Sequence, residues 1–548
     1  MTAEHTVSSY LIDRLYALGV RHIFGVPGDY VLGFYHELED SKLRVINTCD
    51  EQGAGFAADA YARINGLGVV CVTYCVGGLK VANTTAQAFA EKSPVVVISG
   101  APGMKERVKT PLLHHVVRDF DTQLKIFEHI TVASAVIDNA ETACGEIDRV
   151  LNAAIEHKRP VYIELPRDMI SIPVTPAAKS EEAKKKGGAD TLREALEEAI
   201  EIISKAKRPV VVAGVEIQRF GLQPLLQHLL ENTGIPVAST LLSKSVVSEK
   251  YPRYLGVYEG AMCREEVQSY VESSDCLIFL GTFMTDVNLG VFTAHIEQGR
   301  LILATSDKLS IRHHSYEGIG LEDFVEGLLK ANIKKHENLE IPHPPPHQQS
   351  SPVPGKQISV QYLFHSLNAF LDDNTVVLAD PGDAMFGALD MQIQGETEFL
   401  SPAFYTSLGF AIPGGIGVQM ARPEVRPLVL VGDGSFQMSG IELATIARFD
   451  LNPIIVVLNN RGYGTERPML DGSFNDIPLW KYSRIPEVFD KGKGFDVSTE
   501  DQLEEALQQA RKNTGSFCIL DVHISSEDRS PALRRLTATL AKRVQGKA

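Results

Sequence analysis

The sequence is poor in closely spaced cysteines, because only Cys71 and Cys75 of its seven cysteines lie near each other and no CxxC pair occurs. This spacing argues against a disulfide framework and against a cysteine-built zinc site. No apolar run reaches the roughly 18 residues of a membrane span. The first residues also lack the apolar segment of a signal peptide. The sequence therefore predicts a cytoplasmic protein with no membrane partner.

Positive charge is also scarce, since 53 Lys and Arg residues face 69 Asp and Glu residues and leave a net charge of −16. Such a balance disfavours polyanions, and we expect no nucleic-acid partner. What the chain does have is 44% apolar and 22% charged residues, the composition of a globular protein. Its 548 residues exceed what one hydrophobic core supports, so several domains are expected.

Two stretches that favour neither helix nor central strand divide the chain into three blocks. Residues 173–190 are charged and poor in large apolar side chains, and residues 332–357 contain the run HPPPHQQSSPVPG. We therefore expect domains at 1–175, 190–332 and 357–548. Each block alternates helical patterns with short apolar strands, which predicts three consecutive α/β domains with open, mostly parallel sheets.

Short β-branched runs predict the strands, and amphipathic or small-residue stretches predict the helices. The expected strands cover 44–47, 68–73, 95–99, 161–165, 209–213, 276–280, 376–379, 427–431 and 453–458. The expected helices cover 7–18, 51–63, 192–206, 360–371, 413–421, 436–449 and 529–544.

The most informative segment is 432–460, which begins with GDGS and ends with NN. Asp433 follows the strand at 427–431, and Asn460 follows the strand at 453–458, with a helix expected between them. Ligands of such units sit at the carboxyl ends of the strands. A carboxylate and an amide oxygen that converge there are suitable ligands for Mg2+ bound to a phosphate. Two ordinary turns at the ends of strands would produce the same sequence pattern.

The GDG…NN pattern resembles the signature of thiamine diphosphate enzymes. Four further segments resemble those of the pyruvate, indolepyruvate and branched-chain 2-oxo acid decarboxylases, and the resemblance covers essentially the whole chain. They are GVPGDY at 25–30, LLHH at 112–115, NRGYGTE at 460–466 and FNDIP at 474–478 with Trp480 and Tyr482. The resemblance implies pyrimidine, middle and diphosphate domains in that order, with thiamine diphosphate and Mg2+ as cofactors.

By this resemblance, Mg2+ is held by Asp433, Asn460 and the carbonyl of Gly462. The diphosphate rests on Gly434 and Ser435 at a helix start. Leu408 is the apolar wedge that bends the cofactor, and the Thr406 carbonyl accepts a hydrogen bond from the aminopyrimidine. The other implied cofactor contacts are Thr73, Asp383, Tyr463, Gly464 and Thr465.

Glu51 is the implied carboxylate on the aminopyrimidine, where it favours the imino form that takes the proton from the thiazolium carbon. Without the resemblance, Glu51 would be interpreted as an acid at a helix start, as Asp50 is. Residues 53–58 (GAGFAA) also fit a loose dinucleotide-binding pattern. The acid that this pattern requires about 20 residues later, near Thr73, is missing, so NAD or FAD binding is disfavoured.

The resemblance places Asp29, His114, His115 and Glu466 on the reacting side of the cofactor. The implied reaction is nonoxidative decarboxylation of a 2-oxo acid to an aldehyde and CO2 through an ylide and an enamine. The four groups should titrate as a coupled set, and the individual proton donor stays open. Because the family's site lies between two chains, a homodimer is the minimum, and a tetramer formed as a dimer of dimers is expected.

The sequence departs from the family pattern at four positions: Gly78 and Lys80 replace more usual residues, Asp383 replaces a threonine, and Thr465 replaces an apolar β-branched residue. Asp383 could also be a turn or helix cap. The pocket implied for the substrate is mostly aliphatic or flexible, which favours branched-chain or aromatic 2-oxo acids over pyruvate. Its implied members are Val287, Met385, Phe386, Thr465, Leu536 and Leu540.

Two alternatives remain within the superfamily, a carboligase such as acetolactate synthase and a benzoylformate-type decarboxylase. The histidine pair and Glu466 favour proton delivery, and hence aldehyde release. An alternative of another class is an inactive regulator that keeps the fold and binds the cofactor. The intact Asp433, Asn460, Glu51 and Glu466 argue against it.

Overall fold

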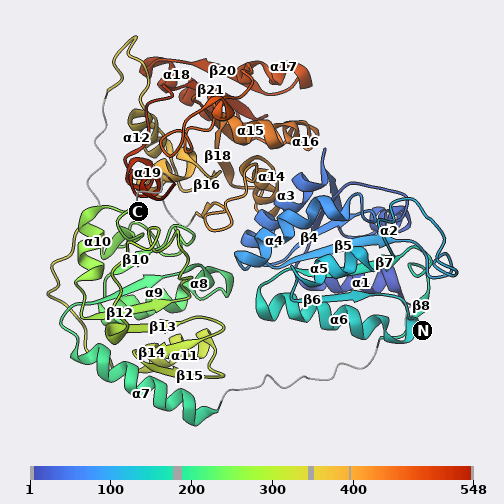
Figure 1. The fold of residues 1–548 in the computed structure, drawn as a ribbon, viewed down its shortest axis with the longest axis horizontal. Coiled ribbons are helices and arrows are strands. Elements are labelled where there is room, and N and C mark those ends of the chain that lie inside the picture. The colour runs from blue at the N-terminus through green and yellow to red at the C-terminus, as the bar shows by residue number, and fades with distance from the viewer. Residues whose placement is uncertain (1–4, 177–187, 344–350, 394–396, 545–548) are drawn as a thin grey trace. The chain divides into compact units, whose positions relative to one another are not determined.

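The computed structural model in Figure 1 describes residues 5–176, 188–343, 351–393 and 397–544. Residues 177–187 and 344–350, inside the two predicted linkers, lie outside the described residues. The chain forms two compact units. The first contains the described residues up to 176 together with 409–425 and 437–452, and the second contains the other described residues.

The first unit is built on a six-stranded sheet whose paired strands are all parallel, in the order β3-β2-β4-β5-β7-β6. The central strands β4, β5 and β7 are buried along their whole length, as strands covered on both faces must be. The six strands are β2 (His22–Gly25), β3 (Arg44–Asn47), β4 (Gly68–Val72), β5 (Val95–Ala101), β6 (Ala133–Val136) and β7 (Val161–Pro166).

Six helices from the N-terminal part of the chain accompany this sheet. They are α1 (Val7–Ala17), α2 (Leu32–Glu39), α3 (Glu51–Asn65), α4 (Ala82–Ala90), α5 (Thr122–Glu128) and α6 (Ala140–His157). A short antiparallel pair, β1 (His5–Thr6) and β8 (Pro173–Val174), ties the beginning of the unit to its end.

Two helices from much later in the sequence, α14 (Ala411–Ala421) and α16 (Leu443–Arg448), belong to the first unit. A Cβ atom on Gly417 of α14 would lie 2.1 Å from the carbonyl oxygen of Ala57 in α3, so only glycine permits this approach. Glu442, just before α16, accepts hydrogen bonds from the backbone N–H groups of Cys49 (3.2 Å) and Asp50 (3.0 Å). These contacts fix the position at which α3 begins.

The second unit contains two sheets. The seven-stranded sheet has the order β11-β10-β9-β12-β13-β14-β15, and its last two strands run antiparallel. Its strands are β9 (Pro209–Ala213), β10 (Val237–Ser239), β11 (Tyr254–Val257), β12 (Cys276–Leu280), β13 (Leu301–Ala304), β14 (Leu309–Ile311) and β15 (His314–Tyr316). Its helices are α7 (Ala189–Lys205), α8 (Val215–Arg219), α9 (Gln223–Thr233), α10 (Glu265–Glu272) and α11 (Leu321–Lys330).

The six-stranded sheet of the second unit is parallel, in the order β17-β16-β18-β19-β21-β20. Its strands are β16 (Thr375–Ala379), β17 (Phe399–Leu400), β18 (Arg426–Gly432), β19 (Ile454–Asn459), β20 (Lys493–Val497) and β21 (Cys518–His523). Its helices include α12 (Val360–Phe370), α13 (Asp383–Gly387), α17 (Pro486–Phe489), α18 (Glu500–Lys512) and α19 (Pro531–Val544).

The predicted fold class, three open and mostly parallel α/β sheets, is confirmed. One predicted element is wrong. The helix expected over 436–449 is broken into α15 (Asp433–Ser439), a 3-10 turn η4 (Gly440–Glu442) and α16. Gly440 weakens the helix at the break, and Glu442 is held instead by the backbone before α3.

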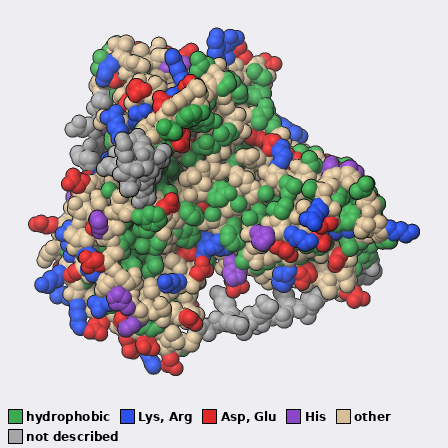
Figure 2. Space-filling model, in the orientation of Figure 1, with side chains coloured by type: hydrophobic (Ala, Val, Ile, Leu, Met, Phe, Trp, Pro, Cys, Tyr) green, Lys and Arg blue, Asp and Glu red, His purple; other side chains and the backbone are tan. Residues whose placement is uncertain are grey.

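The surface carries mixed charge. Figure 2 shows acidic and basic side chains interspersed over the visible face. None of the helices in the described part of the chain combines the length and apolar composition needed to cross a bilayer.

Candidate active site

A cavity of about 330 Å3 lies in the second unit, where strands β16, β18 and β19 end. The loops that follow these three strands form most of its lining, as expected for a parallel sheet. The sequence-predicted residues that line it are Asp383, Met385, Phe386, Thr406, Leu408, Asp433, Gly434, Ser435, Asn460, Gly462, Tyr463, Gly464, Thr465 and Glu466.

Asp433 is 1% exposed and begins α15 directly after β18. Its carboxylate accepts hydrogen bonds from the backbone N–H groups of Gly434 (2.8 Å), Arg461 (2.6 Å) and Gly462 (3.2 Å). Burial raises the pKa of Asp433 to about 6, although these N–H donors favour the charged form. A buried carboxylate in this position is suited to binding a cation, because the cation would offset the free-energy cost of burying the carboxylate's negative charge.

Asn460 provides the second oxygen ligand that a cation would need. Its Oδ1 is buried and has no hydrogen-bond partner among the described residues. A buried amide oxygen is normally paired, so an orphaned one calls for a ligand. Asp433 and Asn460 line the same cavity, with hard oxygen atoms of the kind that Mg2+ prefers. The donor set therefore fits the ion that the sequence predicts.

Two glycines of the cavity lining allow other parts of the same chain to approach the backbone closely. A Cβ atom on Gly434 would lie 2.7 Å from Cε1 of Tyr463. Gly462 has φ +148°, and a Cβ atom there would lie 2.1 Å from the carbonyl oxygen of Asn475. A larger residue at 434 would push Tyr463, in the loop after β19, away from the start of α15, and a larger residue at 462 would push the same loop away from Asn475.

Asp383 is the first residue of α13, and its carboxylate accepts the backbone N–H of Ser530 at 3.0 Å. Burial raises the pKa of Asp383 to about 6. This hydrogen bond joins the loop after β16 to the residue that precedes α19. Asp383 thus makes no capping hydrogen bond within α13; its carboxylate instead binds the backbone before α19, and the side chain also lines the cavity.

Only some of the residues predicted to line the substrate pocket line this cavity. Met385, Phe386 and Thr465 line the cavity. Leu536 belongs to the same hydrophobic cluster as Met385 and Phe386, and Val287 packs against that cluster, but neither lines the cavity. Leu540 lies within α19, and its side chain is outside the described residues.

In the first unit, Glu51 opens α3 and its side chain is 13% exposed. The helix cap is Asp50, whose carboxylate accepts the Gln52 N–H at 2.8 Å. Glu51 instead lies 2.8 Å from the Lys80 ammonium, which also contacts Asp50. Asp50, and not Glu51, therefore caps α3, so Glu51 does not have the capping role that the sequence left open for it.

Asp29, His114 and His115 form a second cluster in the first unit, and their ligand atoms lie within 4.8 Å of one another. His114 Nε2 and Asp29 Oδ2 are 2.7 Å apart, which is a hydrogen bond that can share a proton. The ring of Tyr30 stacks on His114 with centroids 4.8 Å apart. His115 Nδ1 is buried without a partner among the described residues.

Thr73 lies close to this cluster, since a Cβ atom on Gly28, next to Asp29, would be 2.5 Å from Thr73 Cβ. Its hydroxyl is also buried and has no partner among the described residues. The structure thus brings Thr73 together with the Asp-His-His cluster and groups the predicted metal ligands with Glu466 in the second unit.

The sequence analysis assigned no site role to three side chains of the first unit that shape these clusters. They are Lys80 beside Glu51, Tyr30 against His114, and Arg167, whose Nη1 lies 3.9 Å from Asp29 Oδ2. Arg167 directly follows the last residue of β7, so the strand-end rule that revealed Asp433 could have identified it.

Three enzyme-domain families match the chain. They are the N-terminal TPP binding domain of thiamine pyrophosphate enzymes at residues 5–125, their central domain at 196–330 and their C-terminal TPP binding domain at 382–522. TPP, thiamine pyrophosphate, is thiamine diphosphate.

Several curated proteins resemble the chain over nearly its whole length. An indole-3-pyruvate decarboxylase of Azospirillum brasilense is 34% identical, covering 98% of this chain and 97% of that protein. An alpha-keto-acid decarboxylase of Mycobacterium leprae is 32% identical, covering 98% and 95%. Pyruvate decarboxylase 4 of Arabidopsis thaliana is 30% identical, covering 97% and 91%.

Proposed function

The chain belongs to the thiamine diphosphate-dependent 2-oxo acid decarboxylases, and from this premise we propose that it converts branched-chain or aromatic 2-oxo acids to aldehydes and CO2. The family and the decarboxylation of 2-oxo acids are established by its relatives. The choice of substrate, the metal and the assembly are the parts that we propose.

We propose that Asp433, Asn460 and the Gly462 carbonyl hold Mg2+, and that Gly434 and Ser435 bind the diphosphate. The orphaned Asn460 oxygen beside a buried Asp433 is the single observation that carries this assignment. When bound, thiamine diphosphate supplies a nucleophilic carbon that adds to the 2-oxo group and accepts the electrons released with CO2.

The role proposed for the side chains of the protein itself is to hold and transfer protons. We propose that the Glu51 carboxyl, which does not cap its helix and contacts the Lys80 ammonium at 2.8 Å, holds a proton at the pyrimidine ring. Asp29 and His114 share a hydrogen bond of 2.7 Å, so a proton can move between them and reach the carbon that loses CO2. Together with His115 and Glu466 they form the set that protonates the product before release.

The proposed preference for larger substrates depends on Met385 and Phe386. Both line the cavity and pack in a cluster of aliphatic and aromatic residues. Methionine adapts its shape, and one methylene group changes discrimination by only about 1–3 kcal/mol. We therefore propose broad acceptance of branched-chain and aromatic 2-oxo acids.

A homodimer is the smallest assembly that we propose, and a tetramer formed from two dimers is the expected full assembly. Between residues 470 and 488 the second unit exposes large apolar side chains that a monomer would leave in water. They are Leu470 (59% exposed), Phe474 (65%), Leu479 (71%), Trp480 (45%) and Val488 (76%). The expected location in the cytoplasm stays a prediction.

A substrate panel tests the proposed reaction. The purified protein, supplied with thiamine diphosphate and Mg2+, is given pyruvate, 2-oxoisovalerate, indolepyruvate and phenylpyruvate in separate assays. We expect equal amounts of aldehyde and CO2, with higher kcat/KM for the last three than for pyruvate. Acyloin as the main product would favour a carboligase, and a preference for pyruvate would contradict the proposed pocket. No turnover of any 2-oxo acid would favour the regulator.

A further inference from the structure

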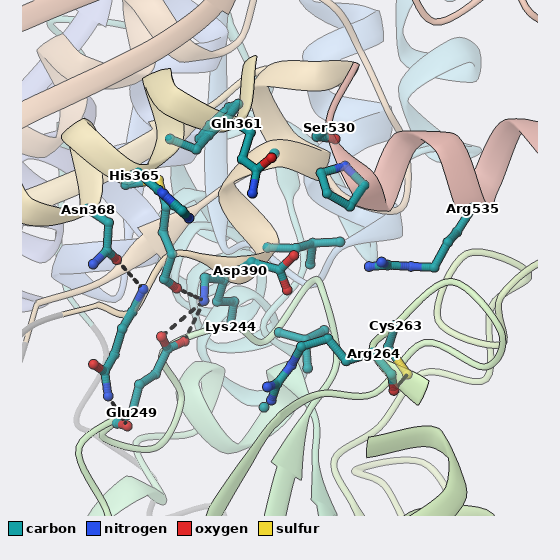
Figure 3. Close-up of a pocket in the computed structure, with 18 of the residues that line it drawn as sticks. Lys244, Glu249, Cys263, Arg264, Gln361, His365, Asn368, Asp390, Ser530 and Arg535 are labelled. Atoms are coloured by element: carbon teal, nitrogen blue, oxygen red, sulfur yellow. Dashed lines mark hydrogen bonds and ion pairs between the residues drawn. The ribbon is translucent and has the colours of Figure 1, made fainter. Parts of the chain in front are cut away.

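Two lysines of this chain hold acidic side chains in different ways. Lys244 of the second unit lines a cavity of about 440 Å3, and its side chain is 2% exposed (Figure 3). It donates to both carboxylate oxygens of Glu249, at 2.8 and 3.0 Å, and to the carbonyl oxygen of Met391 at 2.7 Å. These bonds use all three ammonium hydrogens and both oxygens of the acid, so this pair is structural.

Lys80 of the first unit instead contacts one oxygen of each of two acids. Its ammonium group contacts Oδ2 of Asp50 and lies 2.8 Å from Oε2 of Glu51, and its side chain is 45% exposed. The hydrogen bonds to Asp50 and to Glu51 raise the pKa of Lys80, so the group stays charged. The other oxygen of Asp50, Oδ1, caps α3 by accepting the N–H of Gln52 at 2.8 Å.

The other oxygen of Glu51, Oε1, faces the loop that follows β4. A Cβ atom on Gly77 in this loop would lie 3.3 Å from Oε1. The same loop begins with Thr73, whose buried hydroxyl has no hydrogen-bond partner among the described residues. Lys80 thus holds one oxygen of Glu51, and the second oxygen is directed toward a segment for which the sequence predicts a cofactor contact.

The backbone around Gly78 fixes the position of Lys80. Gly78 and Lys80 lie in the 3-10 turn η1 (Gly78–Val81), and they are two of the positions at which the sequence departs from the family pattern. A Cβ atom on Gly78 would lie 2.0 Å from Oε1 of the buried Gln123, which accepts the N–H of Cys75 at 2.7 Å. Glycine therefore allows Gln123 to hold the start of η1, and this turn places Lys80 beside α3.

We propose that Lys80 is a positioning residue, which holds the Glu51 carboxyl group in the orientation that meets the aminopyrimidine ring of thiamine diphosphate. Lys80 has this role only if Glu51 acts on that ring, as proposed above. A side chain that is already held in place loses less conformational entropy when the cofactor binds. Asp50 makes the arrangement more rigid, because Glu442 accepts its backbone N–H at 3.0 Å and its own carboxylate holds the start of α3.

The opposite role for Lys80 predicts an opposite result. If Lys80 only occupied Glu51 until the cofactor displaced it, cofactor binding would have to break the ion pair, and removal of Lys80 would strengthen that binding. In the proposed role the ion pair persists, because Lys80 uses Oε2 and the ring meets Oε1, and removal of Lys80 weakens binding. The direction of the change in affinity therefore separates the two roles.

Isothermal titration of the full chain, freed of cofactor by dialysis, tests the proposal with two probes in the presence of Mg2+. The probes are thiamine diphosphate and inorganic pyrophosphate, which lacks the pyrimidine ring. We expect Lys80→Met to weaken binding of thiamine diphosphate by about three- to tenfold and to leave binding of pyrophosphate unchanged. The kcat of the reconstituted enzyme should fall by a similar factor with little change in KM. Lys80→Arg keeps the charge and should restore most of both losses.

Lys125→Met is the matched control, because Lys125 lies in the same unit, is 61% exposed and pairs with a single acid, Asp121. It should bind both probes as the unmodified protein does. The proposal is overturned if Lys80→Met binds thiamine diphosphate as well as the control or more tightly, or if it loses pyrophosphate binding to the same extent. If these results occur while Glu51→Gln is inactive, only the role of Lys80 is wrong. Near-full activity of Glu51→Gln would overturn the role of Glu51, and that of Lys80 with it.

Discussion

Adjacent side chains of the same type can have different tasks, one stabilising a helix and the other facing a ligand site. Asp50 and Glu51 are adjacent acids at the start of α3, yet only Asp50 caps the helix. Glu51 is partly buried at 13% exposure, is not used by its own helix, and contacts the Lys80 ammonium instead. The sequence alone could not distinguish the two, because both acids fit a helix start.

Glu51→Gln tests the role proposed for this side chain. The amide keeps the size of the carboxyl but cannot hold or exchange the proton, so kcat is expected to fall by about two orders of magnitude or more. Binding of thiamine diphosphate and Mg2+ should persist, seen as an unchanged thermal stabilisation by the cofactors. Asp50→Asn is the control, since asparagine also caps helices, and it should retain most activity. Near-full activity in Glu51→Gln would contradict the mechanism.

A buried acid of the second unit predicts a pH dependence. Glu259 is 0% exposed, and neither carboxylate oxygen has a partner among the described residues. Burial raises the pKa of Glu259 well above its ordinary value. The folded state therefore holds a proton that the unfolded chain loses above pH ~4.3, and stability falls as the pH rises from there toward the folded pKa.

Glu259→Gln removes this ionisation and keeps the shape. The melting temperature of the variant, relative to the unmodified protein, should therefore be higher at pH 8 than at pH 5 when measured by scanning calorimetry. The exposed Glu317→Gln serves as control and should show no such trend. An equal difference at both pH values would show that Glu259 does not titrate between them.

At the level of helices and strands, apolar patterning predicted the central strands β4, β5, β18 and β19, but not β2 and β21, which also lie inside the parallel sheets. Strands β3, β9 and β12 have the predicted bounds, because each is a short β-branched or aliphatic run between polar turns. The helix predicted over 436–449 is broken, since its residues are held by tertiary contacts that no local pattern shows. The edge strand β20 escaped prediction because most of its side chains are exposed or only partly buried, without an apolar run.

The same distinction holds for the site. Strand-end position predicted Asp433 and Asn460, which line one cavity because their loops follow neighbouring strands of one sheet. Lys80 and Tyr30 could not be found in this way, because their contacts with Glu51 and His114 join loops that are distant in sequence. Linear patterns identify which residues end a strand, but not which loops meet.

Helix α3, which begins at Glu51, is fixed by a buried charge network that yields a prediction. The Arg63 guanidinium contacts Asp59 at 2.9 Å and Glu91 at 2.8 Å, and the three side chains are 0–2% exposed. Burial acts to raise the pKa of Asp59, but the Arg63 charge outweighs it and holds that pKa below its usual value. The carboxylates thus depend on Arg63 for compensation.

Arg63→Met leaves two buried acids without their cation, and the loss is expected to be about 3–5 kcal/mol of stability. Scanning calorimetry should show an early unfolding transition, and hydrogen exchange should show lost protection in α3. The matched control is Arg193→Met, whose ion pairs are at the surface with 69% of the side chain exposed, and it should change stability by about 1 kcal/mol or less. Equal effects of both variants would refute the network's importance.

For the whole molecule, the decisive question is whether one active site uses two chains. Glu51 belongs to the first unit and Asp433 to the second. We expect Glu51→Gln and Asp433→Ala proteins to be inactive alone, the first by loss of proton handling and the second by loss of cofactor binding. Asp433→Ala should show no thermal stabilisation on addition of thiamine diphosphate and Mg2+.

Mixing the two inactive proteins, after mild denaturation and refolding to exchange chains, tests the shared site. If Glu51 acts on the cofactor held by the partner's diphosphate unit, a mixed dimer has one site with both residues intact and one site lacking both. Random pairing makes half of the dimers mixed, so activity should recover to about a quarter of the unmodified level. If both residues served a site within one chain, every site would lack one of them, and the mixture would stay inactive however long the chains exchanged.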